Sequence, residues 1–160
     1  MATDPKTNQA IVGGSYGMGI RHVGAYQVAG HPFITGSSIA TAKCQMVEFP
    51  YISNNFTVIN QTPSVAGTYI RVHFQSGSTT TAIAAPGASG EQSFADTAEV
   101  ITRRHYITLS GSDSVTFNSR CTKLYVSNLC GTSQEYQVAA DLTLIPASKM
   151  YHLTGSGITS

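Results

Sequence analysis

The stretch from residue 135 to residue 145 alternates between apolar and polar side chains with almost no exceptions. Side chains on a β-strand point to opposite faces in turn, so this alternation predicts a strand with one buried face and one wet face. At about 3.3 Å per residue the strand would extend roughly 35 Å, enough to cross a whole sheet. The expected buried set is Tyr136, Val138, Ala140, Leu142 and Leu144, and the expected exposed set is Glu135, Gln137, Asp141 and Thr143.

Shorter segments with the same period recur along the chain and are separated by turn residues. Between residues 68 and 75 we expect Ile70, Val72 and Phe74 to face inward, while the side chains between them, including His73, face outward. Further strands are expected at residues 26–28, 33–35, 45–49, 56–60, 105–109, 114–119 and 122–128. Their expected inward residues are Val47, Phe49, Ile107, Leu109, Val115, Phe117, Leu124 and Val126. Turns are expected at residues 30–32, 61–67, 111–113 and 128–134, and Pro50 is expected to end a strand.

Residues 76–102 interrupt this rhythm. The first part is low in complexity and rich in Ser, Thr, Ala and Gly, which is unlike a core strand. The second part has the pattern of one short helix, with Ser93 and Asp96 spaced as an N-terminal capping box. Connections of this length are uncommon inside a compact domain and are usually functional or disordered. We therefore predict a long surface loop that is a candidate contact region.

Both ends of the chain differ from the strand-rich middle. Residues 1–20 are polar and then glycine-rich, and residues 147–160 contain two further glycines. A phosphate-binding loop in the first segment is disfavoured, because no Lys-Ser/Thr pair follows the glycines and no apolar strand precedes them. We predict flexible N- and C-terminal arms on either side of one domain at residues 21–146.

The strand count and the absence of any long helical pattern indicate an all-β protein. With about eight antiparallel strands and a long closing strand, a single jelly-roll β-sandwich is the favoured architecture. An immunoglobulin-like sandwich is the alternative. It ranks below the jelly roll because its hallmark, a Trp bracketed by a Cys pair, is missing.

Charge and composition narrow the classes of function. Only 11% of the 160 residues are charged, the net charge is +1, and the densest basic run is the pair Arg103 and Arg104. Nucleic-acid binders usually carry a basic stripe, so this role is disfavoured. No apolar run is long enough to span a membrane, and the N-terminus does not resemble a signal peptide. Three cysteines, an odd number, favour free thiols in a reducing compartment.

No catalytic, cofactor or metal site emerges from residue spacing. The five histidines and three cysteines form none of the usual zinc motifs. Glu48 and Asp141 could meet across a sheet as a glycosidase pair, but solvated surface charges are the favoured interpretation. We therefore expect a protein that is not an enzyme. The histidines are His22, His31, His73, His105 and His152, and the cysteines are Cys44, Cys121 and Cys130.

Several segments together resemble tailed-phage virion proteins, especially those of marine and cyanobacterial phages. The resemblance covers residues 24–157. It is carried by FPY followed by a VIN strand, by HYITL, and by an LTLIP close followed by an LTGSG tail. The longer matching runs are GAYQVAGHPFITGS, VEFPYISNNFTVIN, YIRVHFQ, RRHYITLSGSDSVTFNSRCTKLYVSN and DLTLIPASKMYHLTGSG.

The resemblance implies a small jelly-roll capsid decoration protein, or cement protein, on the outside of a virion assembled in the host cytoplasm. It also implies a homo-oligomer, most often a trimer, bound to the major capsid protein, without nucleic acid or membrane. It assigns no role to individual residues. The alternatives are a carbohydrate-binding adhesion module of the tail or fibre and, less favoured, a cupin-type metalloenzyme. The adhesion hypothesis needs exposed aromatic residues, and its candidates are Tyr26, Tyr51, Tyr69 and Tyr151.

Overall fold

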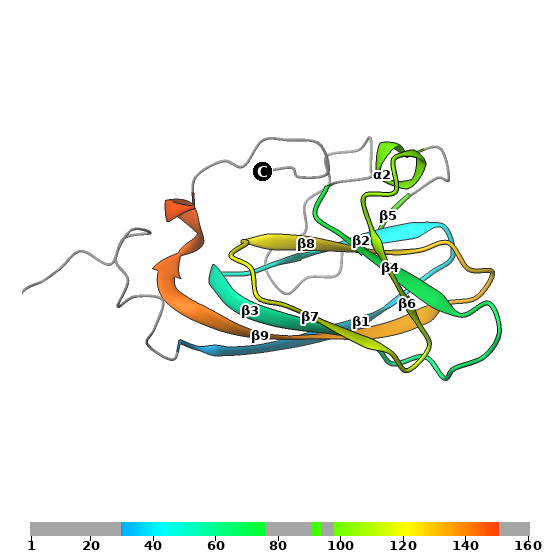
Figure 1. Cartoon of the computed structure of the whole chain (residues 1–160), viewed down its shortest axis with the longest axis horizontal. Coiled ribbons are helices and arrows are strands. Elements are labelled where there is room, and N and C mark those ends of the chain that lie inside the picture. The colour runs from blue at the N-terminus through cyan, green and yellow to red at the C-terminus, as the bar shows by residue number, and fades with distance from the viewer. Residues whose placement is uncertain (1–29, 76–90, 94–97, 151–160) are drawn as a thin grey trace, which may run out of the picture.

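The computed structural model describes residues 30–75, 91–93 and 98–150. Within these residues the strands form two sheets that stack face to face, as Figure 1 shows. This confirms the prediction of an all-β sandwich. The strands are β1 (Pro32–Ile39), β2 (Lys43–Glu48), β3 (Tyr51–Asn60), β4 (Tyr69–His73), β5 (Glu91–Ser93), β6 (Ile107–Ser110), β7 (Ser114–Phe117), β8 (Lys123–Asn128) and β9 (Gln134–Pro146). The helices are α2 (Glu99–Thr102) and the 3-10 turn η1 (Ala147–Lys149).

The strands pair in a nested order, so that the first described strand pairs with the last and the second with the one before it. β1 pairs with β9, β2 with β8, β3 with β7 and β4 with β6, all antiparallel. The resulting sheet orders are β1-β9-β3-β7 and β5-β2-β8-β4-β6, with β5 added beside β2. This nested pairing across two sheets is the jelly-roll arrangement. It decides against an immunoglobulin-like sandwich, because the first described strand lies beside the last one.

The main core fills the space between the two sheets. Phenylalanines link the layers, and their neighbouring ring centroids lie 5.0 to 6.1 Å apart. Phe56 is central, since its ring lies against Phe49, Phe74 and Phe117. Most of the residues that alternation predicted to face inward are buried: Val47, Phe49, Ile70, Val72, Leu109, Leu124, Val126, Tyr136, Val138, Ala140 and Leu142.

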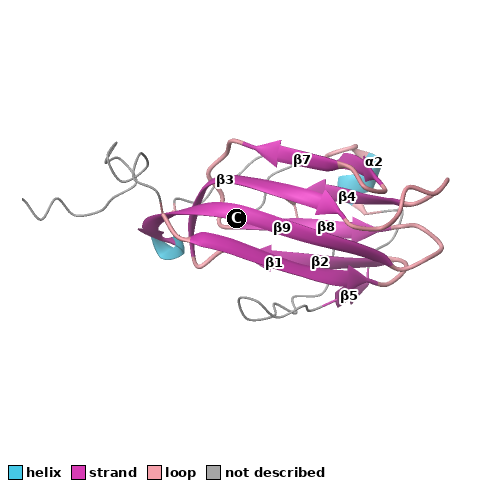
Figure 2. Cartoon of the chain, turned by 90° about the horizontal axis from the view of Figure 1, so that it is seen from below, coloured by secondary structure: helices cyan, strands magenta, loops and turns pink. Residues whose placement is uncertain are grey.

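The five-stranded sheet is also covered on its outer face. Val100 of α2 is fully buried there in a second cluster with Cys44 and Tyr125. Figures 1 and 2 together show α2 on the outer side of this sheet, toward β4 and away from the edge strand β5. The short helix expected in the second part of residues 76–102 is present as α2, but the buried Val100 and strand β5 show that these parts are not a surface loop. Residues 76–90 and 94–97 lie outside the described residues. Ser93 lies in β5, opposite Lys43, and does not cap a helix.

The outer face of the four-stranded sheet is covered at one end. Thr143 points to the expected face of β9, yet only 1% of it is exposed. Its neighbours there are Ile52 and Ile145, which form a third cluster with Met150. The prediction that Thr143 faces solvent is thus wrong, because alternation identifies a face but not what packs on it. Leu144, on the opposite face, is only half-buried.

Other local differences follow from strand ends and edges. Pro32 begins β1 instead of forming a turn, a position where its missing N–H is tolerated. Tyr51 begins β3, which is longer than the expected strand at residues 56–60. Ile107 is 43% exposed because β6 is an edge strand. The expected strand at residues 26–28, the arm at residues 1–20 and the tail beyond residue 150 lie outside the described residues.

Candidate functional site

A buried polar cluster on the outer face of the five-stranded sheet is the strongest candidate for chemistry. His73 Nδ1 lies 2.7 Å from the carbonyl oxygen of Gln75, so this nitrogen is assigned the proton. Nε2 is then an acceptor, 3.2 Å from Ser127 Oγ and 3.9 Å from Cys44 Sγ. The Tyr125 ring stacks on the imidazole at a centroid distance of 5.7 Å. A thiol, an imidazole and a hydroxyl therefore meet under α2.

The electrostatics of this cluster argue against catalysis. Burial lowers the pKa of His73 to about 4, opposed by the hydrogen bond to the Gln75 carbonyl and assisted by the charge of Arg71. Burial also raises the pKa of the Cys44 thiol to about 12. Reactive cysteines have lowered pKa values and partial exposure, whereas this thiol stays protonated at neutral pH. We interpret the cluster as structural.

The other two thiols have structural partners of their own. Burial raises the pKa of Cys121 to about 11, and its Sγ lies 3.4 Å from Ser53 Oγ. Cys130 Sγ donates to the carbonyl oxygen of Tyr69 over 3.0 Å and accepts from the Tyr69 N–H over 3.2 Å. All three cysteines of the chain are free. Each thiol thus joins segments distant in sequence without a covalent bond.

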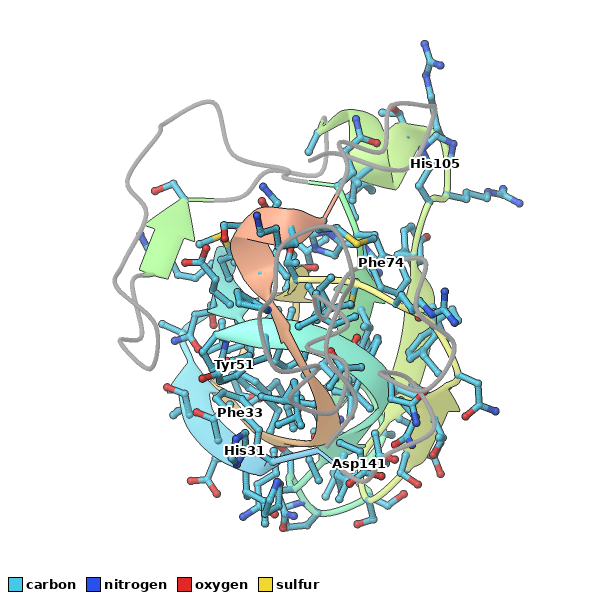
Figure 3. All side chains as sticks on the ribbon, turned by 90° about the vertical axis from the view of Figure 1, so that its left-hand side faces the viewer. His31, Phe33, Tyr51, Phe74, His105 and Asp141 are labelled. Carbon is cyan, nitrogen blue, oxygen red and sulfur yellow. The ribbon has the colours of Figure 1, made fainter. Side chains whose placement is uncertain are left out.

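The residues considered for metal binding are scattered. In the described ranges no three His, Cys, Asp or Glu side chains gather as a metal site. Figure 3 shows His31 and His105 far apart, with His31 beside Tyr51, whose ring centroid lies 5.5 Å away. His73 lies on the expected outer face but is buried instead of exposed, because it packs against Cys44 and Tyr125 of the cluster that includes Val100 of α2. His22 and His152 lie outside the described residues.

The proposed carboxylate pair does not form. Glu48 belongs to β2 and Asp141 to β9, so the two residues lie in different sheets of the sandwich. Asp141 instead accepts a hydrogen bond from Asn55 Nδ2 on the neighbouring strand, over 3.0 Å. These carboxylates do not form the close pair that glycoside hydrolysis requires.

The aromatic candidates for sugar binding do not form one platform either. Tyr51 begins β3, and Tyr69 begins β4 after the chain has run the length of β3, so they lie at opposite ends of the sandwich. Tyr69 contacts Arg71 instead, whose guanidinium carbon lies 5.2 Å from that ring centroid and 4.5 Å from that of Tyr106. Tyr26 and Tyr151 lie outside the described residues.

Arg71 is an unusual cation because two of its three guanidinium nitrogens are buried without a hydrogen-bond partner. Its Nε and Nη1 atoms are buried and have no hydrogen-bond partner. The guanidinium group lies over the rings of Tyr69 and Tyr106. Cation–π contacts of this kind stabilise a folded protein by about 0.5 to 2 kcal/mol. Because the two buried nitrogens are inaccessible to a ligand, we interpret Arg71 as a packing residue and not as a ligand-binding residue.

The outer face of the four-stranded sheet is the most open candidate surface. Strands β1, β3 and β7 contain no charged residue, and β9 contributes Glu135 and Asp141. Its polar side chains bond to each other, as in the 2.8 Å contact between the hydroxyls of Thr57 and Thr116. Ile34 on β1 is 74% exposed, more than any other large apolar side chain described. The low charge and the exposed Ile34 make this face the candidate contact surface among the described residues.

Neither the buried cluster nor the apolar position on β1 was predicted from the sequence. The sequence of β8 did contain a signal for the buried cluster. It reads KLYVSN and alternates too little for a strand with one solvent-exposed face. A strand buried on both faces shows such continuity, and all but its first residue are buried. No local signal identifies Ile34, because its exposure follows from the edge position of β1.

Comparisons with known proteins leave the family undetermined. No protein-family model matches the chain, and no curated protein matches it. A solved structure with detectable similarity is described in the words "Bacillus endospore appendages form a novel family of disulfide-linked pili". It is 15% identical, with a TM-score of 0.31, over 73% of this chain and 94% of that chain. In the described part of the chain, no helix has the length and hydrophobicity needed to cross a bilayer.

Proposed function

We propose that this chain is a structural protein of a tailed-phage virion that decorates and stabilises the outer capsid surface. The observation that carries the proposal is the outer face of the four-stranded sheet, which combines low charge with an exposed Ile34. A cement protein needs a rigid scaffold and a surface for neighbours, and it needs no active site. The structural role of the His73 and Cys44 cluster is consistent with this.

The partners follow from the same proposal. The chain acts as a homo-oligomer, with a trimer as the expected form, and it binds the major capsid protein. A trimer at a local threefold position of the lattice makes three contacts at once. Linked weak contacts add through effective concentration, so modest interfaces give tight attachment.

A sedimentation experiment tests the proposal. The protein is mixed with bare tailed-phage capsids, and co-sedimentation is compared with that of the Gln137→Arg variant. Gln137 lies on the outer face and bonds to Gln61, and both are exposed, so a bulky charge there should reduce capsid binding with little effect on folding. Ser64→Arg, an exposed loop position away from that face, is the matched control.

Three outcomes separate the hypotheses. Capsid binding that Gln137→Arg weakens and Ser64→Arg does not supports decoration. Absence of capsid binding, together with binding to a glycan array, would replace decoration with the adhesion hypothesis. Stoichiometric zinc or iron in the purified protein would revive the cupin-type hypothesis.

A further inference from the structure

The β1 edge of the four-stranded sheet is the longest free edge in the described part of the fold. β1 pairs with β9 on one side, and no described strand lies on its other side, as Figure 2 shows. The other sheet edges, β5, β6 and β7, have three or four residues each, whereas β1 has eight. Short edges are one way in which proteins avoid pairing with other chains, so β1 is the edge suited to accept a strand.

The register tells which backbone groups of β1 face outward. His31 lies opposite Leu142 and accepts a hydrogen bond from the Leu142 N–H over 3.0 Å. Backbone groups alternate along an antiparallel strand, so odd-numbered residues of β1 bond to β9. The backbone groups of Ile34 and Gly36, the Ser38 N–H and the Pro32 carbonyl therefore point to the free edge. The Ser38 carbonyl already accepts a hydrogen bond from Gln45 Nε2 over 2.9 Å.

The usual protection against edge pairing is missing from β1. Proteins block edges with charged side chains, inward charges, bulges or proline. β1 contains no charged residue, and its pairing with β9 runs without a bulge from Pro32 to Ile39. Its proline stands at the first position, where it removes only one donor. The exposed Ile34 adds an apolar side chain at this edge.

We propose that β1 is a self-association edge that pairs antiparallel with β1 of a second copy across a twofold axis at Thr35. In this register Ile34 lies opposite Gly36 of the other copy, and each exchanges both backbone hydrogen bonds. The Ile34 side chain then covers the surface left open by the glycine. Ser38 donates to the Pro32 carbonyl of the other copy, so the missing proline N–H removes one bond at each end.

The occupant is a second copy because the edge is complementary to itself. Two uncharged strands meet without like-charge repulsion, which would oppose pairing of directly opposed residues. The pairing joins the two four-stranded sheets into one continuous sheet. On a capsid it would link neighbouring trimers, since local twofold axes lie between adjacent threefold positions. This last step rests on the proposed function, but the pairing itself does not require a capsid.

Engineered disulfides test the register. Thr35 lies opposite itself as a non-hydrogen-bonded pair, for which the Cα atoms are about 4.5 Å apart, within disulfide range. Ser37 is a matched control, because it is half-buried like Thr35 on the same face, yet its own copies would be roughly 13 Å apart. Under mild oxidation, Thr35→Cys should form a covalent dimer at least about tenfold faster than Ser37→Cys. Equal rates for the two variants would overturn the register.

Solution association tests the edge without any new thiol. The full-length protein should show a concentration-dependent dimer in analytical ultracentrifugation. Ile34→Lys should raise the dissociation constant about tenfold or more. Val65→Lys, at a 64% exposed position in the loop between β3 and β4, should leave it unchanged. A protein that stays monomeric at all concentrations, or an oligomer insensitive to Ile34→Lys, would overturn the proposal. Capsid binding is measured separately, so failure of one proposal does not imply failure of the other.

Discussion

Thr143 Oγ1 donates a hydrogen bond to the carbonyl oxygen of Ile52 over 2.8 Å, and this contact fixes the end of the sandwich where β3 and β9 lose regular register. The same oxygen accepts from the Ile145 N–H over 3.2 Å. Pairing between β3 and β9 is irregular between Tyr51 and Asn55, so some backbone groups lack a ladder partner. One hydroxyl supplies partners to two of them in a site closed to water.

This contact predicts that Thr143→Asp is strongly destabilising. A carboxylate there would be buried without a cation, and it could not donate to the Ile52 carbonyl, so we expect a loss of more than about 3 kcal/mol. Leu142→Asp, which places a charge in the main core, should be at least as severe. Thr108→Asp, on an exposed position of β6, should change stability by about 0.5 kcal/mol or less. Urea unfolding measures all three, and a mild Thr143→Asp would contradict the burial of this face.

His73 predicts loss of stability in mild acid. Its pKa is about 4 in the folded state against the usual 6.5, so below pH 6.5 the unfolded chain binds a proton that the folded chain does not. Stability therefore rises with pH across this window and falls as pH decreases. Between pH 6.5 and pH 5 the loss is about 1.5 kcal/mol at 1.36 kcal/mol per pKa unit, because the unfolded imidazole is already half-protonated at the upper limit.

The control for this pH dependence is a second histidine. His73→Gln should flatten the stability profile between pH 6.5 and pH 5, measured by urea unfolding at several pH values. His31→Gln, at an exposed position, should leave the slope unchanged. If His31→Gln flattened the profile and His73→Gln did not, the attribution of the pH dependence to His73 would be wrong.

The buried Cys44 thiol and the half-buried Cys121 thiol should resist alkylation in the native state. The pKa of Cys44 is raised to about 12 and that of Cys121 to about 11, mainly by burial, and the thiolate is the reactive form. Peptide mapping after iodoacetamide treatment at pH 8 should show little label on either residue, and full label once the protein is unfolded in urea. Rapid native labelling of Cys44 would show that α2 does not cover it.

Arg71 offers a test of how much a stacked cation contributes. Its Nε and Nη1 are buried without partners, so Arg71→Met, which keeps an unbranched chain between Tyr69 and Tyr106, should change stability by about 1 kcal/mol or less. Arg71→Ala should cost more, because it also removes the packing against both rings. Thermal melting compares the two, and equal losses would mean that the charge, and not the packing, stabilises this contact.

Much of the fold follows from local pattern alone. Alternation along residues 135–145 identified the two faces of β9 and placed Tyr136, Val138, Ala140 and Leu142 in the core, as the structure confirms. This works because side-chain direction on a strand is set by backbone geometry, which local sequence controls. The all-β class, the turn at residues 111–113 and the absence of long helices in the described part follow in the same way.

The tertiary structure alone decided which outer faces are covered and which edge is open. His73 and Thr143 lie on the faces that alternation assigns to solvent, but α2 covers the first and the cluster of Ile52, Ile145 and Met150 lies beside the second. The exposure of Ile34 depends on β1 being at an edge, which follows from its pairing with β9 about a hundred residues away. Burial is a property of surfaces brought together by long-range pairing, so no periodicity within a single strand encodes it.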